Sequence, residues 1–181
     1  MRLFIGIRIP DEIKGKIENT VISDIRKKIK EGRIVPLENL HLTLKFIGET
    51  SEDNIPSIKK IISASTDFLP VKATVKGTGI FPDEKNVRVF WIGMDSKGIL
   101  KKLNVFIENG LERQGISKKE ARFKEHITIA RFKSIPKLSS LKEILEKYRD
   151  TIFGNMEIKE LELIKSELSP DGPVYTTIFK I

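Results

Sequence analysis

The sequence predicts an α+β fold made of two similar lobes that share a central cleft. Strand-like and helix-like patterns alternate along the chain, and the order of patterns over residues 1–94 begins again at residue 87 and runs to residue 181. Each copy contains one segment of the form His-apolar-Thr-apolar, at residues 41–44 and 126–129. Such a duplication implies one domain of two lobes related by a pseudo-two-fold axis, with both histidines facing the cleft.

The first copy is expected to begin with a strand and a long helix. Asp11 and Glu12 follow the first apolar run and its closing Pro10, and the helix dipole favours negative charge at this position. Branched apolar residues then recur every four positions, which predicts one buried helix face. In chain order we expect a strand at 2–9, a helix from 11 to about 32, an extended piece at 33–36, a strand at 40–47, a helix at about 51–66 and a strand at 71–79.

The second copy repeats this order after a hairpin-like connection at residues 81–86. Val87, Val89 and Trp91 alternate with polar or smaller residues, which is typical of a strand. The elements expected after this strand are a helix at about 96–114, a charged loop at 118–125, a strand at 126–132, a helix at about 139–149 and two final strands at 156–168 and 173–181.

Composition narrows the class of protein. The 39% hydrophobic and 32% charged residues are typical of a soluble globular chain, and no apolar run approaches the roughly 20 residues that span a bilayer. The absence of cysteine excludes disulfides, thiolate catalysis and cysteine-ligated metals. We therefore expect a monomeric, cytoplasmic protein without membrane association. The net charge of +8 favours a polyanionic partner such as RNA, although a solvated basic surface would have the same composition.

The two histidine segments are the strongest candidates for chemistry. In a strand, His41 and Thr43 share one face and Leu42 and Leu44 the other, and the segment at His126 repeats this arrangement. One such segment would be an ordinary half-buried strand, because threonine is favoured there. Two segments that contain both histidines of the chain indicate paired acid–base chemistry near neutral pH. The Thr43 and Thr128 hydroxyls would then donate hydrogen bonds to phosphate oxygens.

Two basic residues close to these segments are candidate phosphate ligands. Lys45 alternates onto the face of His41, so we expect it beside the phosphate. Arg131 follows the second segment, but strict alternation aims it away from His126. It would therefore serve either a phosphate or a structural ion pair.

Further candidates lie in the basic loop before the second segment and among the aromatic residues. Charged loops are commonly just solvated, but the cations of this loop would contact an RNA backbone. They are Lys118, Lys119, Arg122 and Lys124. Phe46, Phe123 and Tyr175 offer rings for base stacking, and Phe46 and Tyr175 are equally suited to the core. No metal site is expected, because two distant histidines without a carboxylate cluster are poor ligands for one.

These segments resemble those of a known family. Residues 39–49, NLHLTLKFIGE, and 126–131, HITIAR, are similar to the two signatures of the RNA 2′,3′-cyclic phosphodiesterases, first called 2′-5′ RNA ligases, among the two-histidine phosphoesterases. Residues 2–7, 81–82 and 172–175 also look like family features.

The resemblance implies a bilobal α+β fold with an antiparallel sheet and flanking helices in each lobe. It implies hydrolysis of an RNA 2′,3′-cyclic phosphate to a 2′-phosphomonoester without metal or cofactor. His41 would be the proton donor to the 3′ oxygen and His126 the proton acceptor. Some members join or cleave 2′-5′ linkages in tRNA fragments, so tRNA fragments are a further candidate partner.

Two positions depart from the family pattern. Glu125 stands where proline usually precedes the second histidine, and we expect its carboxylate to raise the negative potential near the phosphate. Ile34 stands where tryptophan is common, which would remove one ring from the cleft. The alternatives are a non-catalytic RNA-binding module of the same fold, an enzyme with another substrate (2′-5′ oligonucleotides, tRNA halves that it ligates, or another small cyclic phosphate), and a metal-dependent hydrolase.

Overall fold

The computed structural model describes residues 1–120, 122–170 and 172–181. Its strands are β1 (Arg2–Arg8), β2 (Arg33–Ile34), β3 (His41–Glu49), β4 (Val71–Phe81), β5 (Val89–Asp95), β6 (His126–Arg131), β7 (Ile152–Ile158), β8 (Glu162–Ser169) and β9 (Gly172–Lys180). Its helices are α1 (Asp11–Ile17), a π-helical segment (Glu18–Ile22), α2 (Ser23–Lys28), α3 (Ile55–Ser63), α4 (Ile99–Arg113) and α5 (Leu138–Lys147). Single 3-10 turns cover Leu37–Asn39, Glu52–Asn54 and Thr66–Phe68.

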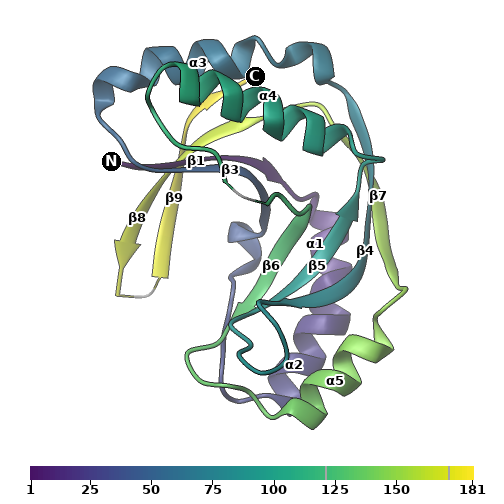
Figure 1. Cartoon of the computed structure of the whole chain (residues 1–181). Helices are drawn as coiled ribbons and strands as arrows, with labels where there is room; N and C mark the ends of the chain where they lie inside the picture. Colours follow the sequence, from purple (N-terminus) through teal and green to yellow (C-terminus); the bar gives the residue numbers. More distant parts are fainter. Residues whose placement is uncertain (121, 171) are drawn as a thin grey trace.

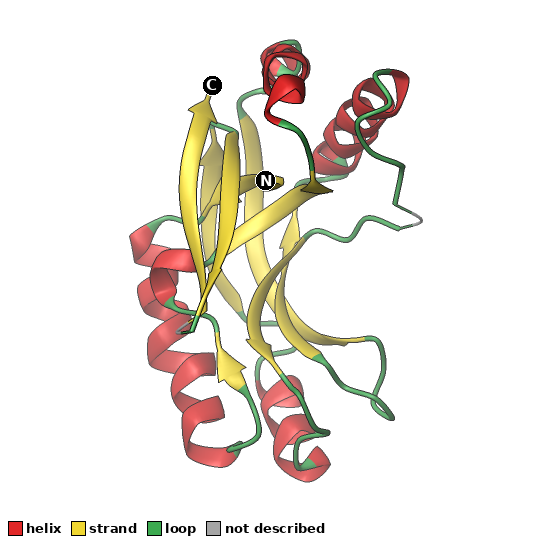
Figure 2. Cartoon of the chain, turned by 90° about the vertical axis from the view of Figure 1, so that its left-hand side faces the viewer, coloured by secondary structure: helices red, strands yellow, loops and turns green. Residues whose placement is uncertain are grey.

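Over the described residues these strands form one nine-stranded sheet. The order is β7-β4-β5-β6-β3-β1-β8-β9, β2 pairs with β6, and every pairing is antiparallel. β3 and β6 are paired through Leu42 and Ile127, where the two four-stranded parts of the sheet join. The predicted α+β, two-lobed architecture is confirmed, with its two antiparallel parts united in one curled sheet (Figure 2).

Each lobe has its own helices (Figure 1). In one lobe, α1 packs on β7, where Ile13 covers Gly154, and α5 is tied to α2 because the Tyr148 hydroxyl donates to Asp24 at 2.8 Å. In the other lobe α3 lies beside α4, and the Asn104 side chain of α4 donates to the Leu44 carbonyl of β3 at 2.7 Å. The helices thereby bury the outer face of the sheet and leave the histidine face uncovered.

The lobes do not coincide with the two halves of the sequence. α1 follows β1 in the chain but packs in the lobe of β4 to β7, while α4 follows β5 but packs against β3. β4 pairs with β5, and β8 returns to pair with β1. Each lobe therefore contains segments from both halves, and the repeat over 1–94 and 87–181 remains a prediction about sequence order.

The predicted strand at 156–168 is two strands. β7 ends at Ile158 and pairs with β4, whereas β8 begins at Glu162 and pairs with β1 in the other lobe. Lys159 and Glu160 form the corner between them. The single-strand prediction is wrong because the apolar residues on both sides of the corner are buried, as they would be in one continuous strand.

A β-bulge occurs in the middle of each histidine strand. In β3, Thr43 pairs with Gly6 and Lys45 with Ile5, so that Leu44 is the extra residue. In β6, Thr128 pairs with Trp91 and Ala130 with Phe90, which leaves Ile129 as the extra residue. After each bulge the faces of the strand exchange, so strict alternation fails there.

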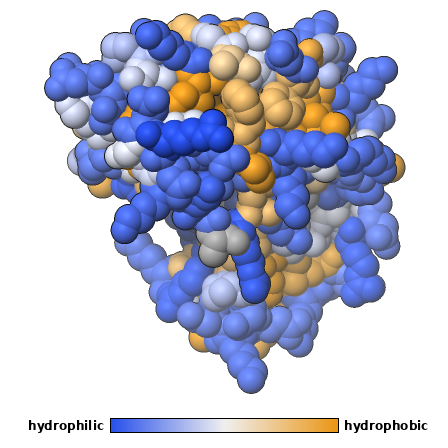
Figure 3. Space-filling view, turned by 45° about the horizontal axis from the view of Figure 1, so that its top comes forward, coloured by the Kyte–Doolittle hydropathy of each residue, from blue (hydrophilic) through white to orange (hydrophobic). Residues whose placement is uncertain are grey.

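The surface is dominated by hydrophilic side chains, with a band of apolar side chains visible between them on the face shown in Figure 3. Among the described residues, no helix combines the length and apolar character needed to cross a membrane.

Candidate active site

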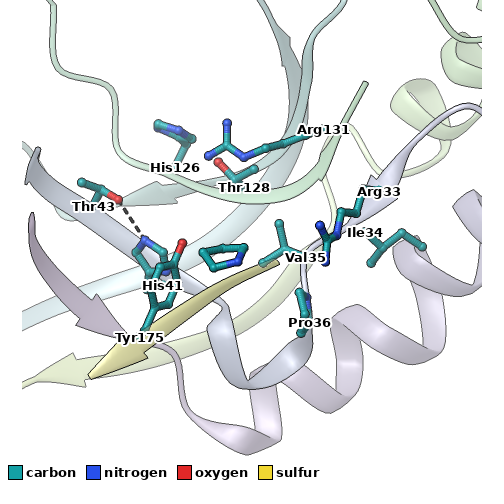
Figure 4. A pocket seen from close by; sticks show the side chains of 11 residues that line it. Arg33, Ile34, Val35, Pro36, His41, Thr43, His126, Thr128, Arg131 and Tyr175 are labelled. Atoms are coloured by element: carbon teal, nitrogen blue, oxygen red, sulfur yellow. Dashed lines mark hydrogen bonds between the residues drawn. The ribbon is translucent and has the colours of Figure 1, made fainter. Parts of the chain in front are cut away.

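The two histidines meet at the junction of the lobes. Leu42 and Ile127 are register partners, so the antiparallel pairing brings His41 beside Thr128 and His126 beside Thr43. These four residues line one pocket (Figure 4). Among the described residues, the lining consists of Arg33, Ile34, Val35, Pro36, His41, Thr43, His126, Thr128, Arg131, Pro173 and Tyr175.

Both imidazoles are anchored in the same way. His41 Nδ1 lies 2.6 Å from the Asn39 carbonyl oxygen, and His126 Nδ1 lies 2.8 Å from the Lys124 carbonyl oxygen. A carbonyl oxygen only accepts hydrogen bonds, so each Nδ1 carries the proton and donates it. This fixes the tautomer and leaves Nε2 of each ring for chemistry.

The surroundings of the two rings differ. His41 packs against Phe4, with ring centroids 4.8 Å apart, and meets Tyr175 edge-on at 5.3 Å. Its Nε2 lies 3.0 Å from the Thr43 hydroxyl oxygen, so the hydroxyl donates to the neutral ring. His126 instead meets Phe81 edge-on at 5.0 Å and Trp91 at 6.3 Å. Each ring is held by aromatic residues of its own lobe.

Burial and positive charge disfavour protonation of both rings. Burial is the main cause that lowers the pKa of His41 to about 4, the hydrogen bond to Asn39 opposes it, and Arg8 and Arg131 add to the lowering. Burial also lowers the pKa of His126, against the bond to the Lys124 carbonyl. Both rings are therefore neutral at pH 7 in the empty pocket, and a bound phosphate anion would favour their protonation.

Arg131 and Tyr175 both line the pocket. The expectation that alternation aims Arg131 away from His126 is wrong, because the bulge at Ile129 buries Ile129 and Ala130 and turns Arg131 to the histidine face. Tyr175 comes from β9, a strand distant in sequence, and its ring covers Phe4 and His41.

The expectation for Lys45 is wrong. The bulge at Leu44 turns Lys45 into the core, where it is 2% exposed. Its ammonium group contacts Glu108 at 2.9 Å, the Lys118 carbonyl at 2.9 Å and Glu120 at 3.4 Å. Lys45 therefore joins β3 to α4 and the following loop, and it does not line the pocket.

The remaining candidates lie outside the pocket lining. Phe46 is 40% exposed, with the Arg2 guanidinium 5.0 Å from its ring centroid. Phe123 and Lys124 line a separate recess beside His126, and the Lys124 ammonium lies 4.5 Å from the centroid of the Trp91 ring.

The basic loop is tied to α4 more than to the pocket. The Lys119 ammonium forms an ion pair with Glu112 at 2.9 Å, and the Lys118 carbonyl accepts a hydrogen bond from Lys45. Residue 121 of this loop lies outside the described residues.

Glu125 belongs to the start of α4. Its carboxylate accepts hydrogen bonds from the Ser96 backbone N–H at 2.9 Å and from the Ser96 hydroxyl at 2.7 Å. The Ser96 hydroxyl oxygen in turn accepts from the Leu100 backbone N–H at 3.0 Å. Both oxygens of the Glu125 carboxylate are thus bound at the helix terminus, and its effect on the potential near the phosphate stays a prediction.

Most of the pocket wall that residues 33–36 and Pro173 contribute was not predicted from the sequence. β2 brings Arg33 opposite Arg131, and the Val35 N–H donates to the Ile129 carbonyl at 2.8 Å. A two-residue strand has too little alternation to be found from sequence. Ile34, noted as a replacement for tryptophan, does lie in the pocket wall. Among the described residues, no group of three or more His, Asp or Glu residues is arranged to hold a metal ion.

Comparison with known proteins gives consistent matches over almost the whole chain. Residues 4–181 match the family model described as AKAP7 2′5′ RNA ligase-like domain. A Methanocaldococcus jannaschii protein named RNA 2′,3′-cyclic phosphodiesterase is 38% identical over 178 residues, covering 98% of each chain. A protein of the same name from Aquifex aeolicus is 36% identical and covers 98% of this chain and 95% of its own. A crystal structure of a Thermus thermophilus protein has a TM-score of 0.84 at 30% identity and covers 100% of this chain and 97% of its own.

Proposed function

The chain belongs to the family of the RNA 2′,3′-cyclic phosphodiesterases, with their 2′5′ RNA ligase-like domain, and we propose that it hydrolyses 2′,3′-cyclic phosphate ends of RNA to 2′-phosphomonoesters. The observation that carries this proposal is the pair of histidines in one pocket, each with Nδ1 bound to a backbone carbonyl and Nε2 on the pocket side, where His41 Nε2 meets only the Thr43 hydroxyl among the described residues. The relatives' names supply the substrate, and the pocket supplies two groups able to exchange protons with it.

In the proposed reaction, His126 Nε2 takes a proton from water while the water oxygen attacks phosphorus. The bond from phosphorus to the 3′ oxygen breaks, and its electron pair goes to that oxygen. His41 Nε2–H protonates the 3′ oxygen, leaving a free 3′ hydroxyl and a 2′-phosphate. The roles of the two histidines follow the family pattern and are part of the proposal.

Thr43 and Thr128 would donate hydroxyl hydrogen bonds to the non-bridging phosphate oxygens. The register of β3 and β6 places each threonine opposite the histidine of the other strand, and the Thr43 hydroxyl, which donates to His41 Nε2 at 3.0 Å, would turn to the phosphate when it binds. Removing one donor of this kind from a preorganised site costs about 100-fold in rate or more.

The low pKa of His41 has a consequence for the acid step. With a pKa of about 4 in the empty pocket, His41 is neutral at pH 7 and needs the bound phosphate anion to acquire its proton. The acid would therefore be charged in the substrate complex, and the charge would favour the anion. Burial of the ring thus couples protonation to substrate binding.

Substitution of each histidine by alanine tests the pair. Both variants should lose hydrolysis of adenosine 2′,3′-cyclic phosphate by several orders of magnitude while circular dichroism remains that of the wild type. Phosphorus NMR should identify a 2′-phosphate product, and a chelator should leave the rate unchanged. Wild-type rates in either variant, or a chelator-inactivated enzyme restored by added metal, would contradict the mechanism.

A substrate whose 3′ bridging oxygen is replaced by sulfur tests the assignment of roles. A thiolate leaves without protonation, so this substrate should restore activity to His41→Ala but not to His126→Ala. Restoration of the opposite variant would exchange the two roles.

A further inference from the structure

Two arginines lie directly opposite each other at one end of the pocket. Arg33 of β2 and Arg131 of β6 are register partners, and partners in an antiparallel pair share a face of the sheet. Both line the pocket, and Figure 4 shows Arg131 beside Thr128 and Arg33 beside Val35. The placement puts two guanidinium groups on the wall of a pocket that is otherwise largely apolar at this end.

Like charges in directly opposed positions destabilise a sheet. Arg8, which also lies near His41, has its guanidinium bound to Glu162 at 3.0 Å. In contrast, no carboxylate of residues 1–120, 122–170 or 172–181 forms an ion pair with Arg33 or Arg131. The positive charge of Arg131 contributes to lowering the pKa of His41. An anion between the two guanidinium groups would relieve their repulsion.

The Arg33 side chain has a defined position. A Cβ at Gly172 of the β8–β9 hairpin would lie 2.4 Å from its Nη2, so the guanidinium rests against the backbone of that glycine. Gly172 also has a φ of +127°, a conformation that side chains rarely adopt. The lack of a side chain at Gly172 therefore gives the Arg33 guanidinium room at the edge of the pocket.

The threonine and arginine ends of the pocket are separated by a distance on the scale of one nucleotide. Arg131 follows Thr128 by three residues, which is at most about 10 Å along an extended strand. Apolar side chains and one tyrosine line the wall around this interval, and such a wall accommodates a ribose and its base. These are Ile34, Val35, Pro36, Pro173 and Tyr175.

The arginines are also shared with a second recess. That recess is lined by Glu31, Gly32, Arg33, Arg131, Lys133 and Ser134. Lys133 adds a third cation beyond the arginines, and Glu31 is the carboxylate in this lining. Together the two recesses form a path from the histidines, over the arginine pair, to the open surface.

We propose that Arg33 and Arg131 bind the phosphate on the 5′ oxygen of the nucleotide whose 2′,3′-cyclic phosphate is hydrolysed. In an RNA end this group is the phosphodiester to the preceding nucleotide, and the preceding chain leaves over Lys133. The enzyme then selects RNA ends over nucleoside 2′,3′-cyclic phosphates. This inference rests on the proposed function, because the hydrolysed phosphate fixes the orientation of the nucleotide.

The test compares kcat/KM for adenosine 2′,3′-cyclic phosphate with that for the same nucleotide carrying a 5′-phosphate. The wild type should prefer the 5′-phosphorylated substrate by about tenfold or more, as expected for charge-assisted bonds to a phosphate. Arg33→Gln should reduce the ratio toward one, and Arg33→Lys should retain part of it, since lysine keeps the charge without the bidentate geometry. Arg113→Gln is the matched control, because Arg113 is an exposed arginine near the end of α4, and it should retain the full ratio.

The ratio separates failure of this inference from failure of the proposed function. Equal kcat/KM values for both substrates in the wild type would overturn the arginine site while leaving the hydrolase in place. A fall of the ratio in Arg113→Gln as large as in Arg33→Gln would also overturn it, because the effect would then be general charge steering. A wild type inactive on both substrates would refute the proposed function. Calorimetric binding of adenosine 2′,5′-bisphosphate against adenosine 2′-phosphate would then test the arginines alone, and equal affinities would reject them.

Discussion

Replacement of Lys45 by methionine distinguishes the structural role of this residue from the phosphate-binding role suggested by alternation. The Lys45 side chain is 1% exposed and its principal partner Glu108 is 7% exposed. The ammonium group donates to two carboxylates and one carbonyl, and Glu108 also accepts from the Glu120 N–H at 2.8 Å. Methionine would retain the volume of the stem but remove the charge.

The expected cost follows from the carboxylate left behind. Breaking a buried ion pair by removing one partner costs about 3–5 kcal/mol, because the remaining charge is uncompensated. Glu120, 48% exposed and 3.4 Å from the ammonium, contributes little to this loss. Since small domains are stable by only about 5–15 kcal/mol, Lys45→Met should be clearly destabilised.

A second substitution should restore the stability. In Lys45→Met with Glu108→Gln, the buried charge is gone and the glutamine oxygen can still accept from the Glu120 N–H. Neutral replacement of a buried pair is often without net cost, so most of the loss should be recovered. Lys60→Met, at an exposed position of α3, is the control and should change the free energy of unfolding by less than about 0.5 kcal/mol.

Urea denaturation and kcat/KM for a nucleoside 2′,3′-cyclic phosphate measure the two roles separately. The expected result is a large loss of stability in the single variant and near-normal kcat/KM in the folded double variant. A Lys45→Met variant that is as stable as the wild type but at least about 100-fold less active would refute the structural role and support phosphate binding by Lys45.

Three further predictions concern the surroundings of the histidines. His41 has a pKa of about 4 when folded and about 6.5 when unfolded, so the unfolded state binds more protons between these pH values. The free energy of unfolding of the wild type should therefore fall by up to about 3 kcal/mol as pH falls from 7 to 4. In urea denaturation, His41→Gln should lack this pH dependence, and an equal dependence in the variant would contradict the pKa shift. Glu125→Gln should cost about 1–3 kcal/mol by weakening the bonds to buried Ser96, without raising the affinity for inorganic phosphate in calorimetry; tighter phosphate binding would instead place the carboxylate near the site. Gly79→Ala places a Cβ 2.1 Å from the Trp91 ring, so it should destabilise by about 1–3 kcal/mol and shift the fluorescence of this single tryptophan, whereas an unchanged spectrum would show that the ring is not held there.

The part of the site that could be predicted from the sequence is the part that follows the two-residue periodicity of a strand. His41 and Thr43 alternate with buried leucines, as do their counterparts in β6, and this pattern survives in the structure. In each strand, the prediction from alternation fails from the residue after the threonine onward. Leu44 and Ile129 are the extra residues of the bulges. Each bulge buries two consecutive residues, and in β3 the second of these is Lys45, a residue type that alternation places at the surface or in a site.

Long-range pairing was the second limit. Arg33, Pro36 and Pro173 reach the pocket only because β2 pairs with β6 and β9 with β8, contacts between distant segments that carry little local pattern. For the same reason, the sequence does not show that α1 and α4 each pack in the lobe formed mainly by strands of the other half. Their apolar faces predict burial, but not which sheet they cover.

The two bulges have the same place in their strands but present different side chains, which makes the pocket asymmetric. The second residue after the extra one is Phe46 in β3 and Arg131 in β6. The backbone of Arg131 lies beyond Thr128, on the side of His41 where Tyr175 also packs, while the Arg131 side chain reaches toward Thr128 and His126 (Figure 4). A nucleotide held by the arginine pair would therefore place its ribose toward His41 and leave the far side of the phosphorus open toward His126. With the proposed roles, in-line displacement would have the 3′ oxygen depart toward His41 and water arrive from His126. The sulfur-substituted substrate should restore His41→Ala even when Arg33 is replaced, because the arginine pair would raise the affinity for the nucleotide, whereas the leaving atom follows from the proposed roles of the two histidines.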